Sequence, residues 1–179
     1  QIATSFDKVA AMPEVAAGVI RTGMPVRPAV AHLRSNPYPE RAPAQPIDIL
    51  VFGGSQGASV FTQVVPAAIA RLEEDLRARL SIVQQCRSDD LDAATAAYRD
   101  MGVAAELASF FDDLPARMAA AHLIICRSGA STIAEATTIG RPAIMVPYPH
   151  AVDDHQATNA HALDEAGGGW LLPEEEIGR

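Results

Sequence analysis

The sequence is poor in aromatic residues and in basic charge, and each shortage narrows the possible functions. Aromatic side chains make up only 5% of the 179 residues and apolar residues 49%, so aliphatic side chains must build most of the core. Fourteen basic residues stand against 22 acidic ones, and a net charge of −8 argues against a general nucleic-acid surface. An anionic ligand must therefore be met locally, by helix N-termini and one or two arginines.

Cysteine and long apolar runs are scarce as well. Cys86 and Cys126 are far apart and lack the spacing of a metal site, so two reduced thiols are the simplest interpretation. No run is long and apolar enough to span a bilayer. The length suits one ordinary domain. Gln1 is not an initiator residue, and a helix start at 173–177 is cut at Arg179, so we expect a piece of a longer protein.

Short apolar runs alternate with helical patterns along the chain. Strands are expected at 1–6, 17–23, 47–52, 80–85, 103–108, 122–126 and 143–146, and helices at about 58–79, 90–101, 114–121 and 153–166. Residues 35–46 contain four prolines and predict a loop. The alternation predicts an α/β fold, a Rossmann-like parallel sheet with helices on both faces, whose ligands lie at the carboxyl ends of the strands.

The most informative stretch is 126–135, where a predicted strand turns directly into a helix that should end at Gly140. Residues 128–132 are small and mostly polar, so an anion can approach the free N–H groups and the positive end of the helix dipole. Glu135 comes about one helical turn later, where its carboxylate can reach two neighbouring hydroxyls. An anion beside a diol is the outline of a nucleotide.

A glycine-rich stretch at 53–58 also follows a strand and opens a helix. Its glycines would let a diphosphate approach the helix N-terminus, but a plain tight turn with Ser55 as N-cap explains the pattern equally well. The stretch has neither the G-x-G-x-x-G spacing of dinucleotide sites nor the Lys-Ser/Thr of a P-loop. NAD binding and ATP hydrolysis are therefore disfavoured.

Two arginines and one helix start complete the candidates. Arg27 and Arg127 can each pair with a phosphate or simply be solvated, and prolines near Arg27 fix its backbone. Gln156 and Asn159 are one helical turn apart and can face one ligand. The consecutive Asp-Asp-His at 153–155 does not converge on one point, so no metal site is expected. No G-x-S-x-G turn supports a hydrolase.

In this order, the motifs at 53–58, 127–135 and 153–160 resemble the MurG family of peptidoglycan glycosyltransferases, and 23–27 and 110–114 extend the likeness to nearly the whole chain. The resemblance implies that residues 1–179 form the C-terminal UDP-sugar donor-binding domain of a two-domain GT-B enzyme whose N-terminal acceptor domain is absent. It implies inverting transfer of N-acetylglucosamine from UDP-N-acetylglucosamine to lipid I, which gives lipid II. The full enzyme would be peripheral on the cytoplasmic face of the bacterial inner membrane, without a cofactor or a nucleic-acid partner.

The resemblance also implies roles for individual residues. Arg27 and Ser55 would contact the diphosphate, the backbone of Phe111 would read the uracil edge, and Gln156 would hold sugar hydroxyls. The phosphates and ribose would be wrapped by Ala130, Ser131, Thr132, Ile133, Ala134 and Glu135, with Glu135 accepting from the 2′- and 3′-hydroxyls. Secondary candidates are Gly54, Gln56, Gly57, Arg127, His155 and Asn159. No residue here is an obvious general base, so the catalytic residues are expected on the absent domain.

Two other classes stay open. One is the corresponding half of a UDP-sugar epimerase, which a carboxylate-rich cleft between two domains would mark. The other is a non-catalytic module that binds nucleotide sugars. Titration with UDP-N-acetylglucosamine, UDP-glucose and NAD would separate these possibilities.

Overall fold

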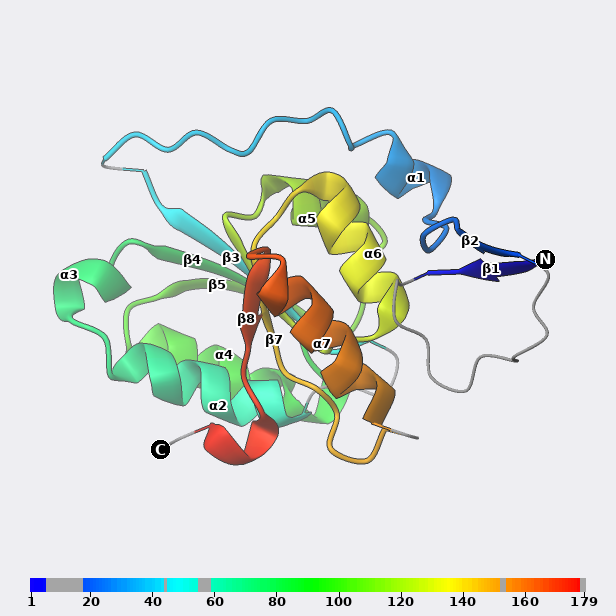
Figure 1. Ribbon diagram of the computed structural model, residues 1–179. Helices are drawn as coiled ribbons and strands as arrows, with labels where there is room; N and C mark the ends of the chain where they lie inside the picture. Colours follow the sequence, from blue (N-terminus) through cyan, green and yellow to red (C-terminus); the bar gives the residue numbers. More distant parts are fainter. Residues whose placement is uncertain (6–17, 44, 55–58, 152–153, 178–179) are drawn as a thin grey trace.

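The computed structural model describes residues 1–5, 18–43, 45–54, 59–151 and 154–177. Its main feature is a six-stranded, all-parallel sheet of order β5-β4-β3-β6-β7-β8 (Figure 1). These strands are β3 (Ile47–Phe52), β4 (Leu80–Gln85), β5 (Ala104–Ala108), β6 (Leu123–Cys126), β7 (Ala143–Met145) and β8 (Gly169–Leu171). A separate parallel pair joins β1 (Ile2–Thr4) to β2 (Val19–Arg21).

Helices cover both faces of the main sheet, as predicted. The helices are α1 (Pro28–Ala31), α2 (Ser59–Ala70), α3 (Glu74–Arg77), α4 (Leu91–Asp100), α5 (Leu114–Ala120), α6 (Ala130–Ile139) and α7 (His155–Glu165), with 3-10 turns η1 (Ser88–Asp90) and η3 (Glu174–Glu176). Successive strand side chains point to opposite faces. Leu50 and Phe52 of β3 therefore pack with α1, α5, α6 and α7, whereas Val51 packs with α2 and α4. The predicted α/β class is confirmed.

The strand order places a topological switch between β3 and β6. The chain progresses from β3 to β4 and β5 on one side, and from β6 to β7 and β8 on the other. At the carboxyl edge Phe52 pairs with Cys126, so β3 and β6 end at neighbouring points of the sheet. Ligands of such sheets bind in the crevice outside this point. The fold thus places the turn between β6 and α6, which the sequence singled out, at the switch point beside the end of β3.

The single helix predicted at 58–79 is wrong, because the chain turns after Ala70 and forms the short α3 before β4 begins at Leu80. Twelve helical residues span about 18 Å, which matches the roughly 20 Å length of a six-residue strand. A 22-residue helix would overshoot the sheet. The helical pattern of the sequence therefore continues beyond Ala70, the residue after which the chain must turn back toward the start of β4.

Other boundaries agree more closely. Gly140 ends α6 in the left-handed conformation at φ 72°, as predicted. Asp154 precedes α7, but it has φ 51° and makes no side-chain cap.

Helix α1 and strand β8 were not predicted. Strand β8 lies so close to β7 at Gly169 that a Cβ on this residue would collide with the carbonyl oxygen of Ala143. This position of the strand therefore requires glycine.

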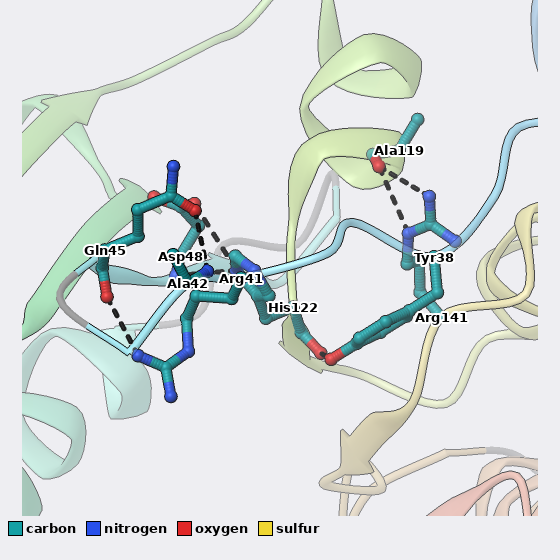
Figure 2. Close-up of polar contacts among 8 residues, drawn as sticks. All are labelled: Tyr38, Arg41, Ala42, Gln45, Asp48, Ala119, His122 and Arg141. Carbon is teal, nitrogen blue, oxygen red and sulfur yellow. Dashed lines mark hydrogen bonds and ion pairs between the residues drawn. The ribbon is translucent and has the colours of Figure 1, made fainter.

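The predicted loop at 35–46 crosses the amino edge of the sheet, where side chains fasten it (Figure 2). Arg141 is 4% exposed and donates to the carbonyl oxygens of Pro37 at 2.9 Å and Ala119 at 2.6 Å. Tyr38 donates its hydroxyl to the carbonyl of His122 at 2.9 Å, and its ring lies 5.6 Å from the Arg141 guanidinium carbon. The loop, α5 and the end of α6 are thereby joined.

Both cysteines are buried free thiols in the core. Cys86 is 3% exposed and Cys126 is 1% exposed. Burial raises the pKa of the Cys126 thiol to about 12 and also raises that of Cys86. In the part of the chain that is described, no helix has the length and apolar character needed to cross a membrane.

Candidate functional site

The N-terminus of α6 opens at the switch point between β3 and β6. Gly129 is its N-cap residue, in an extended conformation, and supplies no side-chain cap to the first turn. The first turn consists of residues 130–133, of which Ile133 is buried in the core. Ile133 donates its N–H to the carbonyl oxygen of Gly129 at 3.0 Å, so the amides of residues 130–132 and the positive end of the helix dipole are the groups that this segment offers a ligand. Ala130 can therefore contribute only its backbone, whereas Ser131, which is exposed, and Thr132 also carry hydroxyl groups.

Asn159 holds the turn that leads into α6. It lies on α7, is 7% exposed, and donates from Nδ2 to the carbonyl oxygen of Ser128 at 3.1 Å. Ser128 is itself fully buried. The structure thus directs this secondary candidate toward the backbone of the β6–α6 turn. Gln156 and Asn159, predicted to face one ligand, have different protein partners.

Arg27 and Glu135, predicted to bind the diphosphate and the ribose, pair with each other. Arg27 Nε lies 2.7 Å from Glu135 Oε1, and Nη2 lies 2.9 Å from Oε2. The Glu135 side chain is 12% exposed and that of Arg27 is 56% exposed. The hydrogen bond to Glu135, helped by its charge, raises the pKa of Arg27 against the effect of desolvation. This bidentate ion pair joins the start of α1 to α6.

Arg127 is directed toward protein groups. Its Nη1 donates to the carbonyl oxygen of Pro147 at 2.9 Å and lies 2.6 Å from Glu174 Oε2. Its guanidinium carbon lies 5.4 Å from the Phe61 ring centroid and 5.5 Å from that of Tyr148. The side chain is 12% exposed. The sequence left Arg127 as a phosphate ligand or a solvated residue; the structure shows a mostly buried side chain with protein partners, which is not the solvated residue.

Gln156 lies in the first turn of α7 and contacts the loop before it. Its Oε1 accepts a hydrogen bond from the backbone N–H of Tyr148 at 3.0 Å. Only the carbonyl end of an amide can accept, so the Nε2 group is the end that can donate to a ligand. His155 begins α7 and is exposed.

The turn after β5 is braced by one arginine. Arg117 pairs with Glu106 at 2.8 Å and with Asp113 at 2.7 Å, and its guanidinium lies 4.2 Å from the Phe111 ring centroid. The bond from Arg117 lowers the pKa of Asp113. Phe111 is 8% exposed, so its side chain belongs to the core and only its backbone is left to meet a ligand; the contact with uracil stays a prediction. Its neighbour Phe110 is 68% exposed.

Some predicted residues lie outside the described part of the chain, namely Ser55, Gln56 and Gly57. Gly54 is described: it follows β3 with φ 71° and is exposed.

The sequence analysis missed Glu174 as a site residue. The run of three glutamates suggested only the start of a helix, and no sequence pattern links Glu174 to Arg127. Among the described residues, no group of three or more His, Cys, Asp or Glu side chains is arranged to hold a metal ion.

The doubly wound parallel sheet, whose strand order reverses between β3 and β6, defines a Rossmann-like α/β domain. Residues 48–179 match the glycosyltransferase family 28 C-terminal domain, and the chain belongs to this family.

Named relatives agree with the family. The UDP-N-acetylglucosamine--N-acetylmuramyl-(pentapeptide) pyrophosphoryl-undecaprenol N-acetylglucosamine transferase of Rhodospirillum centenum is 57% identical over 177 residues, which are 98% of this chain and 47% of the relative. The same-named protein of Paramagnetospirillum magneticum is 53% identical, over 99% of this chain and 48% of the relative. The chain thus spans about half the length of the curated relatives it matches.

Comparison with solved structures supports the same family. The crystal structure of Acinetobacter baumannii MurG matches with a TM-score of 0.71 and 34% identity, over 80% of this chain and 42% of that chain. The resemblance to the MurG family is therefore confirmed. The lipopolysaccharide glycosyltransferase WaaG, at 21% identity and a TM-score of 0.55, shares the fold.

Proposed function

We propose that this chain is the donor-binding half of an inverting glycosyltransferase that moves N-acetylglucosamine from UDP-N-acetylglucosamine to lipid I. The observation that carries the proposal is the α6 N-terminus at the switch point, with Glu135 of α6 paired to Arg27, and with Gln156 on α7, which packs against α6. The names of the relatives supply the donor and the acceptor class.

The first step is donor binding. The α6 amides would receive the diphosphate, the Glu135 carboxylate the ribose hydroxyls, and the backbone at Phe111 the uracil edge. Gln156 would donate from Nε2 to the sugar. An anion at a helix N-terminus is a favourable arrangement, and it suits the acidic chain because the positive field is confined to the site.

The second step is departure of UDP. When the acceptor hydroxyl attacks the anomeric carbon from the opposite face, the bond to the diphosphate breaks and negative charge grows on it. Amides already aimed at this position stabilise the transition state more than the ground state. Removal of one such donor typically costs about 2.7–4 kcal/mol of activation free energy. The general base, the acceptor site and the contact with the cytoplasmic membrane face are assigned to protein beyond this chain.

The ion pair between Arg27 and Glu135 has a consequence for the first step. Arg27 engages both oxygens of the Glu135 carboxylate. Each oxygen has a second lone pair, and ribose hydroxyls that donate to Glu135 would compete with Arg27 for the charge of this carboxylate. A guanidinium released by this competition is then available to the diphosphate. Donor binding would thus replace Arg27 with the ribose hydroxyls as the partner of Glu135.

Isothermal titration of the chain with UDP-N-acetylglucosamine, UDP-glucose and NAD tests the proposal. We expect the first ligand to bind best, NAD not to bind, and EDTA to leave the affinity unchanged. Preferential binding of NAD, or a large loss of UDP affinity with EDTA, would contradict the site. Mixed with UDP-N-acetylglucosamine and a lipid I analogue, the chain alone should yield no product.

A further inference from the structure

We propose that Arg127 is a positioning residue that fixes the amide of Gln156 through the peptide group between Pro147 and Tyr148. The inference rests on the proposed function, in which Gln156 contacts the transferred sugar. It gives Arg127 a role different from direct phosphate binding.

The three groups are connected through one planar unit. The carbonyl of Pro147 and the N–H of Tyr148 belong to the same peptide bond, which is rigid and planar. Arg127 donates to that carbonyl at 2.9 Å, and that N–H donates to Gln156 Oε1 at 3.0 Å. Movement of the guanidinium therefore tilts the plane that orients the Gln156 amide.

The charge on Arg127 also strengthens the second bond. A hydrogen bond from a charged donor is stronger than a neutral one, and consecutive hydrogen bonds through an amide polarise one another. A polarised carbonyl makes the N–H on the opposite side of the peptide a better donor. Gln156 is thus held with Oε1 toward the loop and Nε2 available to the ligand.

Three side chains contact Arg127 and hold it in place. Glu174 approaches it at 2.6 Å, while the rings of Phe61 and Tyr148 flank the guanidinium. With its charge balanced by Glu174 and its side chain 12% exposed, Arg127 is poorly placed to move to a phosphate. Its effect should therefore be confined to the sugar end of the donor.

This orientation selects the chemistry of the ligand. The Nε2 group donates, so the group facing it must accept, as a sugar hydroxyl oxygen or an acetamido carbonyl does. UDP lacks the transferred N-acetylglucosamine residue and should not sense the orientation of Gln156. The difference between UDP and UDP-N-acetylglucosamine therefore isolates the proposed effect.

The test is a double-mutant cycle with Arg127→Met, Gln156→Ala and the double variant, each titrated with UDP and UDP-N-acetylglucosamine. Arg127→Met should weaken UDP-N-acetylglucosamine by about 3- to 10-fold, the range of one lost hydrogen bond, and leave UDP unchanged within about twofold. In the Gln156→Ala background, Arg127→Met should have no further effect. An equal loss for both ligands, or additive losses, would overturn the inference.

Further variants separate this role from a general loss of folding. Glu174→Gln should reproduce the same selectivity at smaller size, and Arg99→Met, which removes an exposed arginine paired with Asp100, should change neither affinity. In ¹⁵N-resolved NMR spectra, the Tyr148 amide proton should move upfield in Arg127→Met as its hydrogen bond weakens. An unmoved signal contradicts the inference itself. If Gln156→Ala leaves the two ligands equally affected, the proposed sugar contact fails instead.

Discussion

Arg127 and Arg141 flank helix α6 at opposite edges of the sheet, and their charges are balanced in different ways. Arg127, just before the helix, pairs with the carboxylate of Glu174. Arg141, just after it, is 4% exposed and donates to backbone carbonyls, including those of Ala119 and Ile139 at the ends of α5 and α6. No carboxylate pairs with it among the described residues.

The helix dipole explains the difference. The end of a helix carries partial negative charge and unpaired carbonyl groups, so a cation buried there is stabilised without an acidic partner. The start of a helix is partially positive, and a cation placed there needs a carboxylate nearby. Desolvation lowers the pKa of Arg141, yet arginine stays charged. We therefore expect the amino edge to govern stability and the carboxyl edge to govern binding.

The largest expected effect comes from Arg141→Met. It leaves buried carbonyl groups without donors, each at a cost of about 1–3 kcal/mol, so the free energy of unfolding should fall by about 3 kcal/mol or more. Urea denaturation measures this loss. UDP affinity of the folded fraction should stay within about twofold. A comparable loss of UDP binding in folded protein would erase the distinction between the two edges.

The next effect belongs to Glu135→Ala at the carboxyl edge. Loss of the acceptor for the ribose hydroxyls should cost about 1.5–3 kcal/mol in UDP affinity, the range for hydrogen bonds to charged groups. Calorimetric titration with UDP and its 2′- and 3′-deoxy analogues provides the measurement. Wild type should bind the analogues poorly, whereas the variant should not distinguish them from UDP. If wild type does not distinguish them, Glu135 does not read the ribose.

Tyr38→Phe tests the amino edge more gently. The variant keeps the ring beside Arg141 but removes the hydroxyl that donates to His122. We expect a loss of about 0.5–1.5 kcal/mol in the free energy of unfolding, as for one net hydrogen bond, again without change in UDP affinity. Unchanged denaturation would show that the loop is not held through this bond.

The smallest expected effect is also the most diagnostic, because it has opposite signs for two ligands. Arg27→Met removes an ion pair that should be worth about 0.2–1 kcal/mol at its partial exposure, so uridine should bind about 1.5- to 5-fold more tightly. UDP should bind more weakly, because its diphosphate loses the cation. Competition titrations measure both. Weaker uridine binding would show that Arg27 orients Glu135 and does not compete for it.

The strands of the main sheet could be predicted from the sequence because parallel strands buried on both faces are short apolar runs, as at 47–52 and 122–126. The helix C-terminus at Gly140 was predictable for a local reason as well, the left-handed conformation. Local periodicity could not show where α2 must stop, since the length of the sheet sets that point. Strand β8 was missed because it contains a glycine required by close packing.

The candidate site was predictable as a set of motifs but not as a set of contacts. Arg27 and Glu135 were both identified, yet their mutual pairing joins positions 108 residues apart in sequence. The partnership of Arg127 with Glu174 depends on the path of the chain after β8, which no local pattern reveals. Sequence motifs indicated the candidate residues, and tertiary structure determined the partners of those that are described.

The burial of both native thiols makes the protein suited to site-directed labelling. Cys86 and Cys126 are shielded by the core, and the raised pKa of each disfavours the thiolate that reacts with maleimides. A cysteine introduced by Phe110→Cys, at a position 68% exposed beside the expected uracil contact, would be far more reactive than either. An environment-sensitive fluorophore attached there would report ligand occupancy in real time, with the native cysteines left in place.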